Sequence, residues 1–477
     1  MPTLTVNTHS DAEVFIIDAS LELIDHHVGR TRRELEPGLY KVKVDRGGAI
    51  KEQLVALESD DAVLDLTIDK FPAVAPIAPM LGGDAGAVQQ LVEDALRKAG
   101  GNCPAEDLLV LLCHWEAGRA DPKRPFAGVR LFPWLASRRA VDVGEAPSAF
   151  AHLGELDWAA AAVPLVEGKR EYILEMRDRS RVSRQVVLTA PGFQTRVFLR
   201  RRPAPSISVE NDPAEARDTI DVSIQMGFPG QSCVYSDHFE TVEVARNILA
   251  KGRAVAAPEL IMSLLHGKFD NPIHGIVGLH LMLGLLEYAA VHPDSDMGAD
   301  HLHAVTGHEP RAYTAMVMRN LREVLAVGAD EAMPADLVAL EARAGLLTGP
   351  PVRVKAPPMF WASWDALRRN AVENGCITIG RDLWQSLGDG APWGPYLAWS
   401  PGRDGLERRL EAMLESLAER ETDAARSLRK SLRPGPALAA ALGIPFSVSR
   451  SLRPLGKRSG IKKIVPRPRA GKDVGQG

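Results

Sequence analysis

The chain has few cysteines, and their spacing does not suggest a metal site. Four cysteines occur in 477 residues and none forms a CxxC pair, so the paired spacing of a zinc ribbon is absent. A set this sparse favours free thiols in a reducing compartment. The first residues, MPTLTVNTHSDAEV, contain neither the basic region nor the apolar run of a secretory signal. We therefore expect a cytoplasmic protein.

The signatures of the common cofactor-dependent enzymes are missing as well. The chain contains no Walker A loop, no GxGxxG fingerprint, no kinase motif set, no HExxH and no GxSxG elbow, and we expect no cofactor. A nucleophile needs a base within reach, and the weak candidates are Ser232 or Cys233 with His238. This hydrolase stays open as an alternative to a protein without enzymatic activity.

Charge is distributed unevenly along the chain. Thirteen Lys and Arg residues and one acid lie from Arg426 to the end, which is +12, and this leaves −16 for the rest of a chain whose net charge is −4. A basic tail on an acidic body can contact a polyanion or an acidic protein surface. Residues 426–477 are therefore a second alternative, a weak polyanion contact.

The first seventy residues predict a small β module. Short alternating runs, among them TLTVNT, EVFIID and EQLVAL, are separated by turn residues. The order from Glu36-Pro37-Gly38-Leu39-Tyr40 onward, with KVKV, a turn, a strand, a turn and a strand, resembles PEGA-type surface β-sandwich modules. The PEGA turn of that family reads EPGL here. The resemblance implies a binding or spacer unit without catalytic residues.

A second stretch repeats this order. Gly168 to Met176 matches Gly38 to Val44, and RQVVL at 184–188 matches EQLVAL at 52–57. The same order at similar spacing indicates two copies of one module. Between them, FPAVAPIAPMLGGDAG is a linker by composition. The apolar run LLVLLCHWE at 108–116 is consistent with either a buried strand or a buried helix.

The period changes to that of helices near Phe239. Helices are expected at 240–252, 258–267, 272–293, 313–328, 335–347 and 357–375, with Asn271 capping a helix that begins at Pro272. The fold class is thus α+β multidomain: two small antiparallel β-sandwich modules, an α-helical body and a disordered basic tail. The expected domains are 1–70, 71–147 (linker and mixed segment), 148–202, 207–400, 401–435 (charged helix) and 436–477 (tail).

The stretch from Pro258 to Pro293 is the most apolar part of the chain and carries four histidines. His274 and His280 are six residues apart, which is not the i, i+3 or i, i+4 spacing of helical metal ligands. A membrane span needs about twenty mainly apolar residues, and His280 interrupts the run. We therefore expect a buried helix pair and no transmembrane segment.

Two further groups of residues are candidate sites. Asp296, His301, His303 and His308 lie close together in sequence and could hold a divalent cation, without matching a known ligand spacing. Trp384, Trp393, Tyr396 and Trp399 form an aromatic stretch rich in Gly and Pro, which is typical of recognition loops. The alternative for the aromatic stretch is a loop packed across the helical body.

These observations favour a protein-interaction or scaffold protein without enzymatic activity. The β modules are of a binding type, and no catalytic signature is present. The expected partners are other proteins. The hydrolase and the polyanion-binding tail remain the alternatives.

Overall fold

The computed structural model describes most of the chain up to residue 402. The described residues are 1–71, 73–77, 81, 84–100, 104–116, 118, 120–136, 140–178, 181–202, 219–232, 237–252, 255–293, 296–327 and 333–402, with isolated positions as far as 448. The chain divides into two units, Met1–Arg409 and Leu410–Gly477. The predicted helix at 401–435 and the predicted tail at 436–477 lie almost wholly outside the described residues. Helix and strand contents of 34% and 33% confirm a mixed α+β chain.

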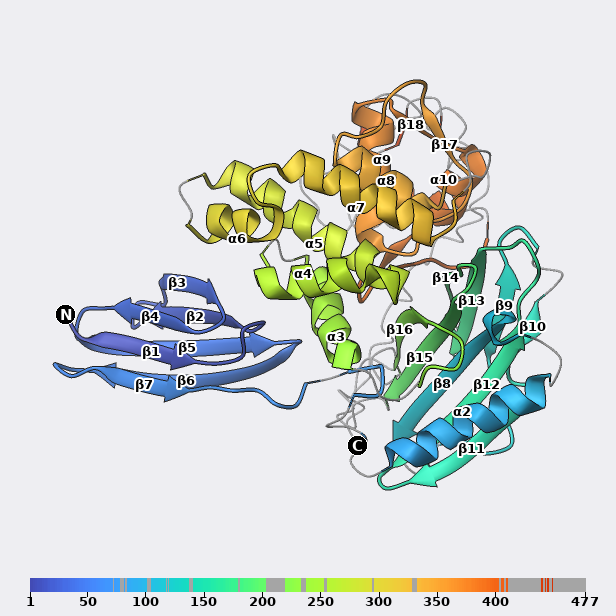
Figure 1. The fold of residues 1–477 in the computed structure, drawn as a ribbon, viewed down its shortest axis with the longest axis horizontal. Coiled ribbons are helices and arrows are strands. Elements are labelled where there is room, and N and C mark those ends of the chain that lie inside the picture. The colour runs from blue at the N-terminus through green and yellow to red at the C-terminus, as the bar shows by residue number, and fades with distance from the viewer. Residues whose placement is uncertain are drawn as a thin grey trace, which may run out of the picture. The chain divides into compact units, whose positions relative to one another are not determined.

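The N-terminal module contains two sheets that share one hydrophobic core (Figure 1). The side chains of Leu4, Val14, Ile16, Val42 and Val44 are almost fully buried in this core. They come from alternate positions of their strands, as a half-buried sheet requires. The three-stranded sheet has the order β4 (Thr31–Glu34), β1 (Thr3–Asn7), β7 (Ala62–Asp65), and the four-stranded sheet has the order β3 (Leu23–Val28), β2 (Glu13–Asp18), β5 (Gly38–Arg46), β6 (Ala49–Leu57).

The second β region also has two sheets, and they include strands from before residue 148. The five-stranded sheet has the order β11 (Ser148–Leu153), β12 (Leu156–Pro164), β8 (Leu108–Glu116), β15 (Gln194–Arg202), β16 (Thr219–Gly227). The four-stranded sheet has the order β10 (Val141–Asp142), β9 (Val129–Pro133), β13 (Glu171–Asp178), β14 (Arg181–Leu188). Helix α2 (Ala85–Ala99) packs on β11 and β12 (Figure 1).

The strand β8 resolves the ambiguity of the LLVLLCHWE run. Eight of its nine residues are buried, because it has a strand on each side and both faces are covered. Its pairing with β12 and β15 joins the predicted 71–147 segment to the predicted second module. The 148–202 stretch therefore does not fold as a separate unit, and the predicted boundary at residue 147 falls inside one pair of sheets.

The two β regions share a strand order over their central parts. In each, a hairpin (β5–β6 or β13–β14) has an antiparallel neighbour on its first strand, namely β2 or β9. The next strand then leaves for the other sheet and pairs in parallel with the first strand of the region: β7 with β1, and β15 with β8. The prediction of antiparallel modules was therefore wrong for these two pairs. Parallel strands need a crossover connection, and in each region the strands of the other sheet lie between the two paired strands in the chain.

Helices make up most of the chain from residue 237 to 387. They are α3 (Asp237–Ala250), α4 (Pro258–His266), α5 (Pro272–Val291), α6 (Asp296–Thr306), α7 (Pro310–Val324), α8 (Ala335–Arg343), α9 (Trp361–Glu373) and α10 (Arg381–Leu387). Two short pairs lie near the end, β17 (Val352–Val354) with β18 (Ile377–Ile379) and β19 (Ala391–Trp393) with β20 (Tyr396–Ala398).

Helix α5 lies in the centre of this body and packs against α3, α4, α6, α7 and α8. The predicted cap is confirmed: the Asn271 Oδ1 accepts the N–H of Ile273 at 3.1 Å, and Pro272 is at the first helical position. By length and composition α5 could cross a membrane, but 67% of its apolar window is buried inside the protein, as in a core helix. A Cβ at Gly275 would lie 2.6 Å from Leu321, so glycine permits this close packing.

In the predicted linker at 71–86, the described residues 71 and 73–77 are buried. Val74 and Ala75 are almost fully covered, and backbone groups of Ala73 and Val74 bond to side chains of α3, β8 and β15. The Val74 N–H donates to Glu243 of α3 at 2.7 Å, and the Val74 carbonyl lies 3.2 Å from the His114 Nε2 of β8. The composition, rich in Pro and Ala, indicated a flexible connection, but these tertiary contacts hold the segment in one place.

Candidate interaction surface

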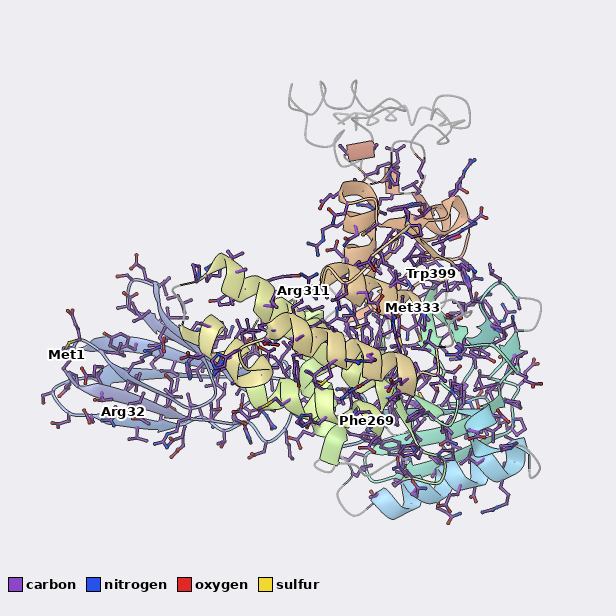
Figure 2. All side chains as sticks on the ribbon, turned by 45° about the horizontal axis from the view of Figure 1, so that its top comes forward. Met1, Arg32, Phe269, Arg311, Met333 and Trp399 are labelled. Carbon is purple, nitrogen blue, oxygen red and sulfur yellow. The ribbon has the colours of Figure 1, made fainter. Side chains whose placement is uncertain are left out.

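Exposed apolar side chains are concentrated in the N-terminal module. Fifteen large apolar side chains are exposed in the described part of the chain, and eight of them lie within the first 63 residues. Isolated exposed apolar residues are normal, whereas a concentration of them marks an interaction site. Figure 2 shows the side chains of this module, with Arg32 at its surface. The surface of the module is therefore the first place to look for function.

The side of the four-stranded sheet that points away from the shared core is called the outer face. Since side chains alternate along a strand, the burial of Val14, Ile16, Val42 and Val44 leaves Phe15, Ile17, Leu39, Lys41 and Lys43 on the outer face. Cross-strand neighbours on this face form rows: Leu23, Ile17, Lys41 and Leu54 in one; His26, Phe15, Lys43 and Glu52 in the next; Val28, Glu13, Asp45 and Ile50 in the third.

The first row forms the apolar end of the outer face. Leu23, Leu39 and Leu54 are 56%, 50% and 65% exposed, and Leu39 lies opposite Ala56 in the adjoining row. The second row is more polar. The His26 ring stacks on Phe15 with centroids 4.5 Å apart, and Lys43 lies 5.8 Å from the centroid of the same ring. The apolar end therefore has a border of aromatic and cationic groups.

The third row meets helix α3. The Lys251 Nζ, just after α3, lies 2.7 Å from the Asp45 Oδ2, and the buried Arg46 bonds both Asp11 at 2.9 Å and Glu240 of α3 at 2.6 Å. A hollow beside these groups has a volume of about 10 Å³, which is room for one water. The acidic groups here hold the module against α3, and the hollow is too small for an organic ligand.

One edge of the outer face has no partner. Strand β6 pairs with β5 along nine residues, and no strand in the described part of the chain pairs with its other side. Its burial pattern is largely exposed, including Ile50 and Leu54. A free edge presents a row of backbone donors and acceptors that another strand can use. The apolar end and this free edge together form the candidate interaction surface.

The predicted nucleophile pair is only partly within the described residues. The Ser232 Oγ donates to the Gln89 Oε1 of α2 at 3.1 Å, and the Ser232 carbonyl accepts from Arg196. Cys233 lies outside the described residues, and His238 belongs to α3 by its backbone only. The bond from Ser232 to the Gln89 amide orients the hydroxyl, and an amide oxygen is not a base.

The predicted metal ligands lie on or just after helix α6. His303 and His308 have ring centroids 4.4 Å apart, and burial lowers the pKa of His301. The side chain of Asp296 lies outside the described residues. Among the groups that are described, no set of three His, Cys, Asp or Glu side chains converges on one point. The predicted loop is mostly helix, and His301 and His303, two positions apart on α6, do not share a face.

The predicted aromatic binding residues pack mainly in the core. Trp384, Tyr396 and Trp399 are each at most 4% exposed, and only Trp393 is partly open. The Tyr396 hydroxyl accepts a hydrogen bond from the Ile224 N–H of β16 at 2.9 Å. Trp399 and Arg184 exchange two backbone bonds, so the loop extends the edge of β14. The structure thus supports the alternative of a packed loop.

A buried Ser, His and Asp occur together on helices α5, α8 and α9. The His280 Nε2 lies 2.9 Å from the Ser363 Oγ, and Ser363 also bonds to the carboxylate of Asp336. Burial, with the nearby cation Arg343, holds the pKa of His280 well below its usual range. The neutral ring can donate from Nε2 to Ser363. All three side chains are buried, so no substrate reaches them, and the network joins the helices instead.

His114 gives stability a defined pH dependence. Burial lowers its pKa to about 4, while the unfolded side chain titrates near 6.5, so the unfolded state binds more protons between these values. The contribution of the buried neutral His114 to the free energy of unfolding is full above pH 6.5 and is lost as the pH falls towards 4. We expect the free energy of unfolding, measured in urea, to fall by about 2 kcal/mol more between pH 7.5 and 5 in the wild type than in His114→Gln. His308→Gln, at an exposed position, is the control, and an equal slope in all three proteins would contradict the assignment.

Comparisons with protein-family models, curated proteins and solved structures find no match to this chain. A function therefore has to be argued from the residues themselves. The residues that the sequence patterns did not single out are Leu39, Ile50 and Leu54. The sequence does contain a signal for these residues. Strands 38–46 and 49–57 carry apolar residues on both faces, whereas a strand with one buried face needs apolar residues on that face only.

Proposed function

We propose that this chain is a protein-interaction protein without enzymatic activity, and that the outer face and free edge of its N-terminal module, a binding unit of β-sandwich type, are its docking surface. The observation that carries the proposal is that four of the eight exposed large apolar side chains in the first 63 residues lie on the outer face, namely Leu23, Leu39, Ile50 and Leu54. Leu39 and Leu54 belong to neighbouring rows of the same face. Water-exposed apolar rows of this kind are stabilised when a partner covers them.

The remainder of the 1–409 unit supports the role of a framework. Several of its buried polar side chains form internal bonds, as with Glu243, Arg246 and His280. Ion pairs from Asp45 and Arg46 attach the module to α3 at the end of the sheet opposite the apolar row, so the apolar end stays available. Cys113 and Cys376 are unpaired, which favours the reducing cytoplasm as the setting.

The test is affinity capture with paired surface variants. The double variant Leu39→Glu/Leu54→Glu should lose the proteins that the wild type retains, because two charges would have to be buried at the interface. The matched control is Leu135→Glu/Val291→Glu, at positions 84% and 71% exposed outside the module. Quantitative mass spectrometry of the captured proteins measures the effect. Identical captured sets for the two double variants would rule out the outer face as the docking surface.

A further inference from the structure

Within strand β6, residues 49–55 have a hydropathy pattern that is symmetric about Glu52. From residue 49 to residue 55 the sequence is Ala-Ile-Lys-Glu-Gln-Leu-Val, that is, two apolar, three polar and two apolar residues with Glu52 in the middle. A contact across a twofold axis brings the same surface of both copies together, so it requires a surface that is complementary to itself. A palindromic edge strand meets that requirement.

Antiparallel pairing of two β6 strands about Glu52 places apolar residues opposite apolar residues and polar residues opposite polar residues over residues 49–55. Ile50 would lie opposite Leu54 of the second copy, Ala49 opposite Val55, and Lys51 opposite Gln53. Opposed side chains point to the same face, so the outer faces of the two copies would continue each other. A shift of two residues along the strand, centred on Gln53, would instead place Glu52 opposite Leu54 and Lys51 opposite Val55. The register about Glu52 pairs residues 49–55 without placing a polar residue opposite an apolar one, which the shifted register does not achieve.

The central charges are compatible with this pairing. Two Glu52 side chains would meet at the axis, which is unfavourable for bare carboxylates. In each copy, however, the Lys41 Nζ lies 2.7 Å from the Glu52 Oε2, and Lys43 is the direct neighbour of Glu52 on β5. Each carboxylate therefore brings its own counter-charge to the axis. In the antiparallel arrangement, the ends of the two sheets that contact α3 lie at opposite ends of the paired strands.

We infer that the partner for the free edge is a second copy of this chain, joined through β6 in the register about Glu52 to form one eight-stranded sheet. The inference rests on the proposed function for the location of the surface and adds the identity of the occupant. Pairing along seven residues is a small contact, so we expect a reversible dimer that depends on concentration.

Sedimentation velocity of the full chain over a roughly hundred-fold range of concentration tests the association. The wild type should shift from monomer to dimer. Leu54→Lys should weaken the dimer about tenfold or more, since it places a cation opposite Ile50. Glu52→Gln should tighten it by roughly two- to five-fold, since it removes the like charges at the axis. Leu135→Lys is the matched control, and circular dichroism confirms that each variant is folded.

Oxidative cross-linking tests the register. Glu52→Cys places two thiols opposite each other at the axis and should form an intermolecular disulfide, whereas the thiols of Lys51→Cys would lie on a diagonal and should cross-link poorly. A wild type that stays monomeric throughout, a dimer insensitive to Leu54→Lys, or equal cross-linking of the two cysteine variants would overturn the inference. If the chain is monomeric while capture of other proteins still depends on Leu39 and Leu54, the proposed function stands and the second copy is excluded.

Discussion

Leu281→Asp is expected to abolish folding of the 1–409 unit. Leu281 is 2% exposed in the middle of α5, and α5 packs against five other helices. The substitution removes a buried apolar side chain and places a carboxylate in the interior of the helical body. Each effect costs several kcal/mol, and the sum of more than about 5 kcal/mol is comparable with the whole stability of a typical domain. Circular dichroism, solubility and limited proteolysis measure the outcome.

Val291→Asp is the matched control for this experiment. It makes the same chemical change in the last turn of the same helix, at a side chain that is 71% exposed, and should change stability by less than about 0.5 kcal/mol. His274→Ala, also on α5, should be milder than Leu281→Asp, since it buries no charge. A soluble and cooperatively folded Leu281→Asp protein would show that α5 is not the core of the body.

The second large effect is expected for Glu243→Ala on α3. The Glu243 carboxylate is fully buried and bonds both the Val74 N–H at 2.7 Å and the Arg246 guanidinium at 3.2 Å. Burial by itself would lower the pKa of Arg246, but the ion pair with Glu243 leaves it raised, so Arg246 stays charged. Removal of Glu243 leaves a buried cation and a buried N–H unpaired, and we expect a loss of about 3–5 kcal/mol in chemical unfolding.

Glu240 on the same helix provides the comparison. Its side chain is 37% exposed and pairs with Arg46, so Glu240→Ala should cost about 1 kcal/mol or less. The double variant Glu243→Ala/Arg246→Met should recover part of the loss, because it removes the cation together with its partner. Equal effects of Glu243→Ala and Glu240→Ala, or a double variant less stable than Glu243→Ala, would show that the pair does not hold α3 and the 71–77 segment together.

The candidate surface could be found in part from the sequence. Alternation within 38–46 assigns Tyr40, Val42 and Val44 to one face and Leu39 to the other. That Leu54 and Ile50 lie on the same exposed face as Leu39 depends on the pairing register of β5 and β6. That the β6 edge is free depends on the strand order of the whole sheet. Alternation alone thus contains the signal that Leu39 is exposed, but it does not show that Leu54 and Ile50 adjoin it.

For the aromatic stretch, the sequence predicted exposure and the structure shows burial. Trp384, Tyr396 and Trp399 looked available in a segment rich in Gly and Pro, because local composition suggests a surface loop. Their burial follows from backbone bonds between Trp399 and Arg184 of β14, more than two hundred residues earlier in the chain. No local pattern can report a contact over that separation.

The sequence by itself determined the elements whose causes are local. Asn271 and Pro272 set the start of α5 by cap chemistry, and alternation set the buried faces of the N-terminal strands. The tertiary structure decided which strands pair, and therefore the parallel returns of β7 and β15, the central place of β8 and the free edge of β6. It also decided that Val74 is held in place, since Glu243 and His114 bond it from distant elements. Hydrogen bonds between remote segments depend on how the whole chain packs, whereas sequence periodicity reflects only the local structure of each segment.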